Sequence, residues 1–138
     1  MDAYRQLLDH DIKPSQQRIA LMDFLLMNPI HPTAEEVYSR LCKKMPTLSK
    51  TTVYNTLKLF VQRGAAQMLT IDERNACFDA NTAPHAHFLC KECTRIYDLH
   101  EIGNVWSKVP GKVDGCQVDE IQLYYRGICE KCIRKQKK

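Results

Sequence analysis

The chain has 138 residues, of which 44% are hydrophobic and 26% charged, and its formal net charge is +4. This length suits one domain or two small ones, and this hydrophobic content is enough for an ordinary core and excludes a disordered chain. No apolar run approaches the roughly 18 residues of a membrane span, and the amino terminus lacks a charged-then-apolar leader, so we expect a cytoplasmic protein.

In the first half of the chain, hydroxyl side chains mark the starts of three predicted helices. Ser15, Thr33 and Ser49 each precede a run with apolar residues at helical spacing. A hydroxyl oxygen in this position accepts hydrogen bonds from the free amides of the first helical turn. Thr33 and Glu36 also have the spacing of a capping box. The last of the three helices is predicted over 50–63.

Two strand-like runs follow these helices, over 65–71 and 76–80. Three helices and a β-hairpin predict a winged helix-turn-helix domain over 1–80, a fold that places its third helix in the major groove of DNA. Not one Asp or Glu occurs between Val37 and Ile71, as a polyanion-binding surface requires. The alternative is a helical bundle with a hairpin and no DNA partner.

The third predicted helix presents a polar and cationic face, and we expect it to contact double-stranded operator DNA. For contacts with base edges we predict Thr51, Tyr54 and Asn55, and for contacts near phosphates Lys50, Lys58 and Arg63.

A second, smaller α/β domain is predicted over 85–138, after a hinge over 81–84, because Cys and His become dense there and the segments become strand-like. Its strands are expected over 85–89, 95–99 and 117–126, with a helix over 101–109. The basic residues 134–138 are expected to form a solvated tail. The whole chain is thus predicted to have an α+β fold.

Four of the seven cysteines form two Cys-x-x-Cys pairs, Cys90 with Cys93 and Cys129 with Cys132. In a reducing compartment such pairs indicate a metal site rather than disulfides. Four thiolates form a closed tetrahedral shell that suits a structural Zn²⁺ ion. A redox dithiol or an iron–sulfur cluster is the alternative. The isolated cysteines, Cys42, Cys77 and Cys116, are expected to be small buried side chains.

A second candidate metal site involves histidines and aspartates. His85 and His87 are two residues apart on a predicted strand and therefore share a face. Asp98 and His100 repeat this spacing on a probable neighbour of that strand. Imidazole and carboxylate together suit Fe²⁺ or Mn²⁺ and do not exclude Zn²⁺. His31 lies between prolines, in what we expect to be an exposed turn.

Three segments of the chain resemble the ferric uptake regulator (Fur) superfamily: His31–Tyr38, Thr51–Leu57 and His85–Cys93. They occur in the order and spacing of that family, and the likeness runs from about Ile12 to Cys132. The resemblance implies a homodimer of winged-helix domains joined through carboxy-terminal dimerisation domains. It also implies a regulatory metal ion at the hinge.

Within the superfamily the chain is most similar to the peroxide-responsive repressor (PerR) branch. That likeness implies that His31, Asp79, His85, His87 and Asp98 hold the regulatory Fe²⁺ or Mn²⁺. Iron-uptake members usually carry glutamate in place of the two aspartates. The likeness further implies that iron-dependent oxidation of His31 or His85 by hydrogen peroxide releases the repressor from its operator. Mn²⁺ would support DNA binding with little response to peroxide.

A further metal site of many iron sensors looks lost, because Ala86 and Ile121 occupy its positions.

Three other functions were weighed against this hypothesis. A repressor that senses iron or zinc availability would use the same sites. A metalloenzyme would use His85, His87 and Asp98, but the chain has no Ser/His/Asp set, Gly-rich phosphate loop or HExxH motif, so we expect no enzyme. A zinc-stabilised interaction module would not bind DNA. We expect neither a membrane partner nor a small-molecule substrate beyond peroxide as a signal.

Overall fold

A computed structural model describes residues 2–71, 76–82, 85–99 and 111–136. The chain divides into two compact units, Met1–Thr82 and Ala83–Lys138. The expected helix over 101–109, and His100, lie outside the described residues.

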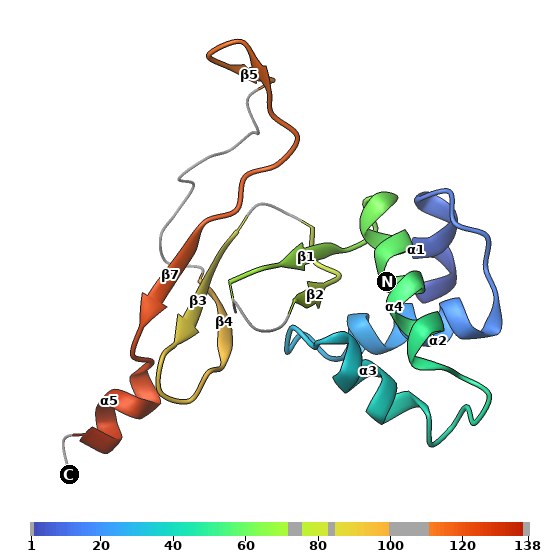
Figure 1. The fold of residues 1–138 in the computed structure, drawn as a ribbon, viewed down its shortest axis with the longest axis horizontal. Coiled ribbons are helices and arrows are strands. Elements are labelled where there is room, and N and C mark those ends of the chain that lie inside the picture. The colour runs from blue at the N-terminus through green and yellow to red at the C-terminus, as the bar shows by residue number, and fades with distance from the viewer. Residues whose placement is uncertain (1, 72–75, 83–84, 100–110, 137–138) are drawn as a thin grey trace. The chain divides into compact units, whose positions relative to one another are not determined.

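The first unit contains four helices followed by a small antiparallel hairpin (Figure 1). The elements are α1 (Ala3–Asp9), α2 (Gln16–Met27), α3 (Ala34–Leu41), α4 (Lys50–Gln62), β1 (Gln67–Leu69) and β2 (Cys77–Asp79). The three predicted hydroxyl caps are confirmed, since Ser15, Thr33 and Ser49 each accept a hydrogen bond from an amide in the first turn of the helix that follows. Thr33 and Glu36 form the complete capping box.

The core of the first unit forms around the apolar stripe of α4. Val53, Leu57 and Phe60 recur at helical spacing on this helix and are fully buried. Phe78 of β2 belongs to the same core cluster. Truncating Phe60 to alanine would therefore cost about 3–5 kcal/mol. The hairpin is the wing of the predicted winged helix-turn-helix, with paired strands shorter than the expected runs over 65–71 and 76–80.

The second unit is built on a three-stranded sheet in the order β4-β3-β7. The strands are β3 (Ala86–Cys90), β4 (Ile96–Leu99) and β7 (Tyr124–Gly127). Strand β3 pairs antiparallel with β4 and parallel with β7. A separate hairpin comprises β5 (Lys112–Val113) and β6 (Cys116–Gln117), and the described part of the chain ends in α5 (Glu130–Gln136).

Three expectations for this unit are wrong. The long strand over 117–126 is not continuous, because only β7 finds a partner in β3 while Gln117 pairs within the β5–β6 hairpin. Of the residues 134–138 that were expected to form a tail, the described ones up to Gln136 are the last turn of α5, where the Arg134 guanidinium pairs with Glu130 one turn earlier. Cys116 is exposed, because the short β5–β6 hairpin has no buried face.

The other isolated cysteines differ from each other: Cys77 is buried as expected, whereas Cys42 is half-buried at the end of α3. None of the helices in the described part of the chain is long and apolar enough to cross a membrane.

Candidate metal centres

The four cysteines of the Cys-x-x-Cys pairs meet in the second unit. Cys90 ends β3, Cys93 lies in the turn that follows, and Cys129 and Cys132 flank and enter the first turn of α5. The Sγ atoms of Cys90 and Cys132 are 3.7 Å apart, and those of Cys93 and Cys129 are 3.8 Å apart. Four sulfurs placed tetrahedrally about 2.3 Å from a zinc ion lie about 3.8 Å from each other. The cluster therefore has the dimensions of a Cys₄ zinc site.

Backbone amides lower the pKa of two of the four cysteines and so favour the thiolate form that binds a cation. Burial alone would raise the pKa of the Cys90 thiol, but hydrogen bonds from the amides of Cys93 and Cys129, at 3.5 and 3.4 Å, outweigh it and lower this pKa to about 6. The amide of Cys132 and the hydroxyl of Tyr97 lower the pKa of Cys129. The pKa of Cys132 is raised to about 12, first by its hydrogen bond with Cys129 and then by burial. Metal binding at this cluster therefore displaces a proton from Cys132.

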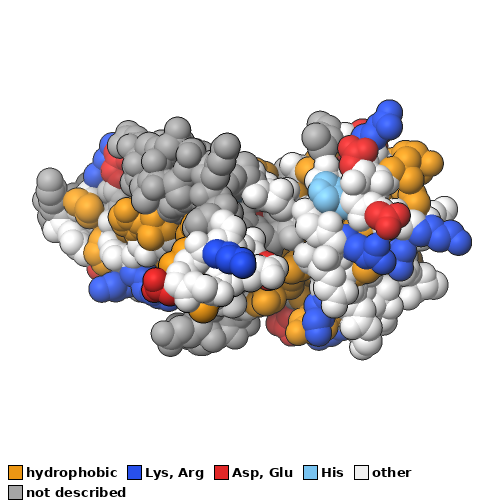
Figure 2. All heavy atoms as spheres, turned by 90° about the horizontal axis from the view of Figure 1, so that it is seen from above, with side chains coloured by type: hydrophobic (Ala, Val, Ile, Leu, Met, Phe, Trp, Pro, Cys, Tyr) orange, Lys and Arg blue, Asp and Glu red, His pale blue; other side chains and the backbone are white. Residues whose placement is uncertain are grey.

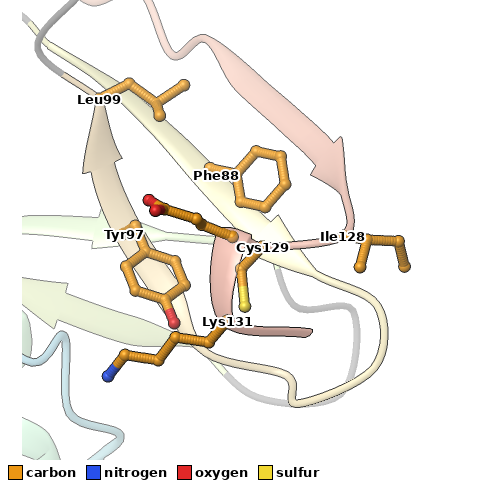
Figure 3. A pocket seen from close by; sticks show the side chains of 7 residues that line it. Phe88, Tyr97, Leu99, Ile128, Cys129 and Lys131 are labelled. Atoms are coloured by element: carbon orange, nitrogen blue, oxygen red, sulfur yellow. The ribbon is translucent and has the colours of Figure 1, made fainter. Parts of the chain in front are cut away.

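A pocket of about 420 Å³ lies beside the cysteine cluster (Figure 3). Its lining is mostly apolar and shares one residue, Cys129, with the cluster. Among the described residues that line it there is no histidine or aspartate, so it is separate from the described donors of the second candidate metal site.

In the first unit, His31 and Asp79 lie side by side and form what we call the amino-terminal donor pair. Thr33 and Cys77 form an antiparallel bridge, and the Phe78 amide donates to the Pro32 carbonyl over 2.9 Å. In this register His31 falls opposite Asp79, and its Nε2 atom is 3.4 Å from Asp79 Oδ2. The pair places an imidazole nitrogen beside a carboxylate oxygen, a donor combination that could hold a metal ion.

The expectation of an exposed turn at His31 is wrong, because only 5% of this residue is exposed. The bridge between Thr33 and Cys77 packs the turn that contains His31 against β2. His31 also has a φ of 58°, an uncommon conformation for a residue with a side chain. Such strained backbone often occurs at functional positions.

The carboxylate of Asp79 is held by the chain that follows it. The amide of Asn81 donates to Asp79 Oδ1 over 2.9 Å, while Oδ2 faces His31. This link was not predicted from the sequence, although an Asp that can accept from the amide two residues later is a recognised turn pattern.

In the second unit, His85, His87 and Asp98 come together and form what we call the carboxy-terminal donor set. His87 lies directly opposite Asp98 across the antiparallel β3–β4 pair, and His85 is two residues earlier along the chain. The Nε2 atoms of His85 and His87 are 3.2 and 3.3 Å from the same oxygen, Asp98 Oδ1. The predicted shared face is thus confirmed for these three residues.

The spacing within both groups fits metal ligands. Two ligand atoms at right angles around an ion about 2.1 Å away lie about 3.0 Å apart. The measured nitrogen–oxygen separations of 3.2–3.4 Å are close to this value. Imidazole nitrogen with carboxylate oxygen suits Fe²⁺ and Mn²⁺ as well as Zn²⁺.

The exposed face of α4 carries the residues that were predicted to contact DNA. Lys50, Thr51, Tyr54, Asn55 and Lys58 are all exposed. The Lys58 Nζ atom lies 5.2 Å from the Tyr54 ring centroid, so cation and aromatic ring form one surface. The first turn of α4 contains no acidic residue, so the amides that Ser49 does not cap can meet an anion such as phosphate.

Arg63 lies at the opposite end of α4, about 20 Å from Lys50. Its guanidinium donates to the carboxylate of Asp11 at 3.2 Å and to the carbonyl of the same residue at 3.3 Å. These contacts tie α4 to the turn after α1. On the face of the molecule drawn in Figure 2, acidic side chains lie among the basic ones, so the exposed face of α4, and not the total charge, indicates a DNA surface.

Comparisons with known proteins agree with a chain that has candidate metal sites and a candidate DNA-binding helix. The model of the Ferric uptake regulator family matches residues 9–126. The "Peroxide operon regulator" of Bacillus subtilis is 32% identical over 136 residues, which are 98% of this chain and 94% of that protein.

The solved structures that are similar to this chain include one PerR and one ferric uptake regulator. The PerR from Streptococcus pyogenes, described as a basis for peroxide sensing and gene regulation, is 27% identical with a TM-score of 0.53, over 96% of this chain and 94% of that one. The ferric uptake regulator from Pseudomonas aeruginosa with manganese has a TM-score of 0.72 over 94% of this chain and 99% of that one, and at 19% identity it supports the fold alone. The chain therefore belongs to the ferric uptake regulator family of metal-dependent transcription regulators.

Proposed function

We propose that this chain is a homodimeric repressor that binds operator DNA when one regulatory metal ion is held jointly by the amino-terminal donor pair and the carboxy-terminal donor set. Each group is too small to satisfy an ion such as Mn²⁺, which prefers about six ligands. The pair contributes two side chains and the set contributes three. The observation that carries the proposal is that each group places a histidine nitrogen 3.3–3.4 Å from an aspartate oxygen, as ligands of one ion are spaced.

A second ion, Zn²⁺, has a structural role in this proposal and binds Cys90, Cys93, Cys129 and Cys132. A closed shell of four thiolates leaves no open position for chemistry. The ion fastens α5 to the end of β3, in a unit too small to be stabilised by its core alone.

The regulatory ion acts by joining two bodies. The DNA-binding domain over 1–80 supplies His31 and Asp79, the hinge spans 81–84, and the dimerisation domain over 85–138 supplies the other ligands. With all five in place, the two α4 helices of the dimer are held at the separation of successive major grooves. Metal binding and operator binding then strengthen each other by the same factor, typically 5–150-fold for a coupling of about 1–3 kcal/mol.

On the exposed face of α4, we assign base contacts to Thr51, Tyr54 and Asn55 and phosphate contacts to Lys50 and Lys58. The ion pair with Asp11 favours a structural role for Arg63 over the phosphate contact predicted from its charge.

The signal that we propose is hydrogen peroxide. Hydrogen peroxide would be the two-electron oxidant: with bound Fe²⁺ as the catalyst, one of its oxygen atoms would be inserted into a C–H bond of a ligand imidazole and the other would leave as water. Oxidation of His31 or His85 removes a nitrogen donor, so the two domains are no longer held together and the dimer leaves its operator. The two aspartates at Asp79 and Asp98 and the likeness to a peroxide operon regulator support this choice. Peroxide consumes the sensor, so the chain is not an enzyme.

The test compares zinc-loaded protein carrying Fe²⁺ with the same protein carrying Mn²⁺, before and after a low dose of peroxide. The DNA is a duplex selected from a randomised library by the Mn²⁺-loaded protein. We expect only the Fe²⁺ form to lose DNA binding and to gain the mass of one oxygen atom on His31 or His85. Retained binding in both forms would instead identify a sensor of iron or zinc availability, and equal loss in both would refute iron-dependent oxidation.

A further inference from the structure

The carboxylate of Asp79 lies at one end of a chain of hydrogen bonds that begins on the neighbouring strand. Gln67, the first residue of β1, is the register partner of Asp79 across the hairpin. The Gln67 side chain reaches past the last paired residue and donates from Nε2 to the Asn81 carbonyl over 2.8 Å. The Asn81 amide in turn donates to Asp79 Oδ1 over 2.9 Å.

This geometry fixes the chain just where the backbone ladder stops. The paired register of the hairpin ends at Gln67 and Asp79. Just beyond this pair, the Gln67 side-chain amide donates to the Asn81 carbonyl and so holds Asn81 in place. Because Asn81 is held, its own amide keeps one oxygen of Asp79 occupied and leaves the other directed toward His31.

We propose that Gln67 is a positioning residue for the regulatory metal site, acting on Asp79 through Asn81. This inference rests on the proposed role of Asp79 as a ligand. Groups that hydrogen-bond to metal-bound carboxylates and histidines typically change metal affinity 10–100-fold when they are removed. Gln67 is one hydrogen bond further from the ion than such groups, so we expect its removal to lower Mn²⁺ affinity roughly tenfold, at the low end of this range.

The test uses Gln67→Glu, which keeps the length of the side chain but cannot donate to a carbonyl. Gln67→Lys retains a donor and should preserve Mn²⁺ affinity. Gln16→Glu, at the exposed first residue of α2, controls for the added charge. Each zinc-loaded protein is titrated with Mn²⁺ by calorimetry, its thermal midpoint is measured without Mn²⁺, and its DNA binding is measured at saturating Mn²⁺.

We expect Gln67→Glu to weaken Mn²⁺ binding roughly tenfold while its thermal midpoint and its DNA affinity at saturating Mn²⁺ stay at the wild-type values. An unchanged Mn²⁺ affinity would overturn the inference. A lowered thermal midpoint, shared by Gln67→Glu and Gln67→Lys, would also overturn it, because Gln67 would then only strengthen the wing.

A double-mutant cycle with Asp79→Asn separates this inference from the proposal on which it rests. If Gln67 acts through Asp79, then Gln67→Glu causes no further loss of Mn²⁺ affinity in the Asp79→Asn background. Additive losses would refute action through Asp79. If Asp79→Asn alone leaves Mn²⁺ affinity unchanged, then the assignment of Asp79 as a ligand fails first.

Discussion

Asp98 offers a direct test of the carboxy-terminal donor set, because one of its oxygens faces two imidazole nitrogens at 3.2 and 3.3 Å. Asp98→Asn keeps the shape of the side chain and removes its charge. A unit negative charge about 2.1 Å from a divalent cation contributes about 4 kcal/mol even at the dielectric constant of water. Asn keeps a neutral oxygen and is less costly to desolvate. We therefore expect a net loss of about 2–3 kcal/mol, or roughly 30- to 150-fold in Kd.

The assay is calorimetric titration of Mn²⁺ into zinc-loaded protein. Asp114→Asn, in the exposed β5–β6 turn of the same unit, is the matched control and should bind as wild type does. Zinc content should be unchanged in both variants, because the cysteine cluster does not use either aspartate. A wild-type Kd for Asp98→Asn would refute the assignment of this carboxylate as a ligand.

Three further predictions concern zinc, DNA and the fold. Cys132→Ser should lose zinc, measured by atomic absorption, and with it much of the roughly 10–16 kcal/mol that a structural zinc ion contributes. The control Cys116→Ser, at an exposed position, should keep its zinc. A full zinc content in Cys132→Ser would contradict the Cys₄ assignment. Lys58→Ala should reduce the slope of log K against log salt for DNA binding by about 0.9 for each phosphate contact removed, whereas the control Lys112→Ala should leave the slope unchanged. An unchanged slope in Lys58→Ala would argue against Lys58 as a phosphate contact. Thr33→Ala removes the α3 capping box and should lower the free energy of unfolding by about 1 kcal/mol in urea denaturation, and equal stability would show that the cap is dispensable.

Local features of this fold could be predicted because they depend on neighbours in the chain. The caps at Ser15, Thr33 and Ser49 need only a hydroxyl and the next turn of helix. The shared face of His85 and His87 follows from the two-residue period of a strand. Each Cys-x-x-Cys turn by itself brings its two sulfur atoms within reach of one ion. These features account for the α4 surface, the cysteine cluster and the carboxy-terminal donor set.

Features that depend on distant partners could not be predicted from the residue pattern. The position of His31 beside Asp79 requires the bridge between Thr33 and Cys77, and no local sequence pattern predicts that bridge. Arg63 has the charge of a phosphate contact, but Asp11 engages it from another part of the chain. Similarly, the strand-like run over 117–126 has suitable residues throughout, and only its last part meets β3.

The measurement that tests the central claim most directly is the Mn²⁺ stoichiometry of zinc-loaded protein by equilibrium dialysis, for wild type, His31→Ala and His87→Ala. One shared ion predicts a single tightly bound Mn²⁺ per chain, with tight binding lost in both variants although the two histidines belong to different units. A second tight Mn²⁺ per chain, or wild-type affinity in His31→Ala, would contradict the claim that one ion joins the two donor groups.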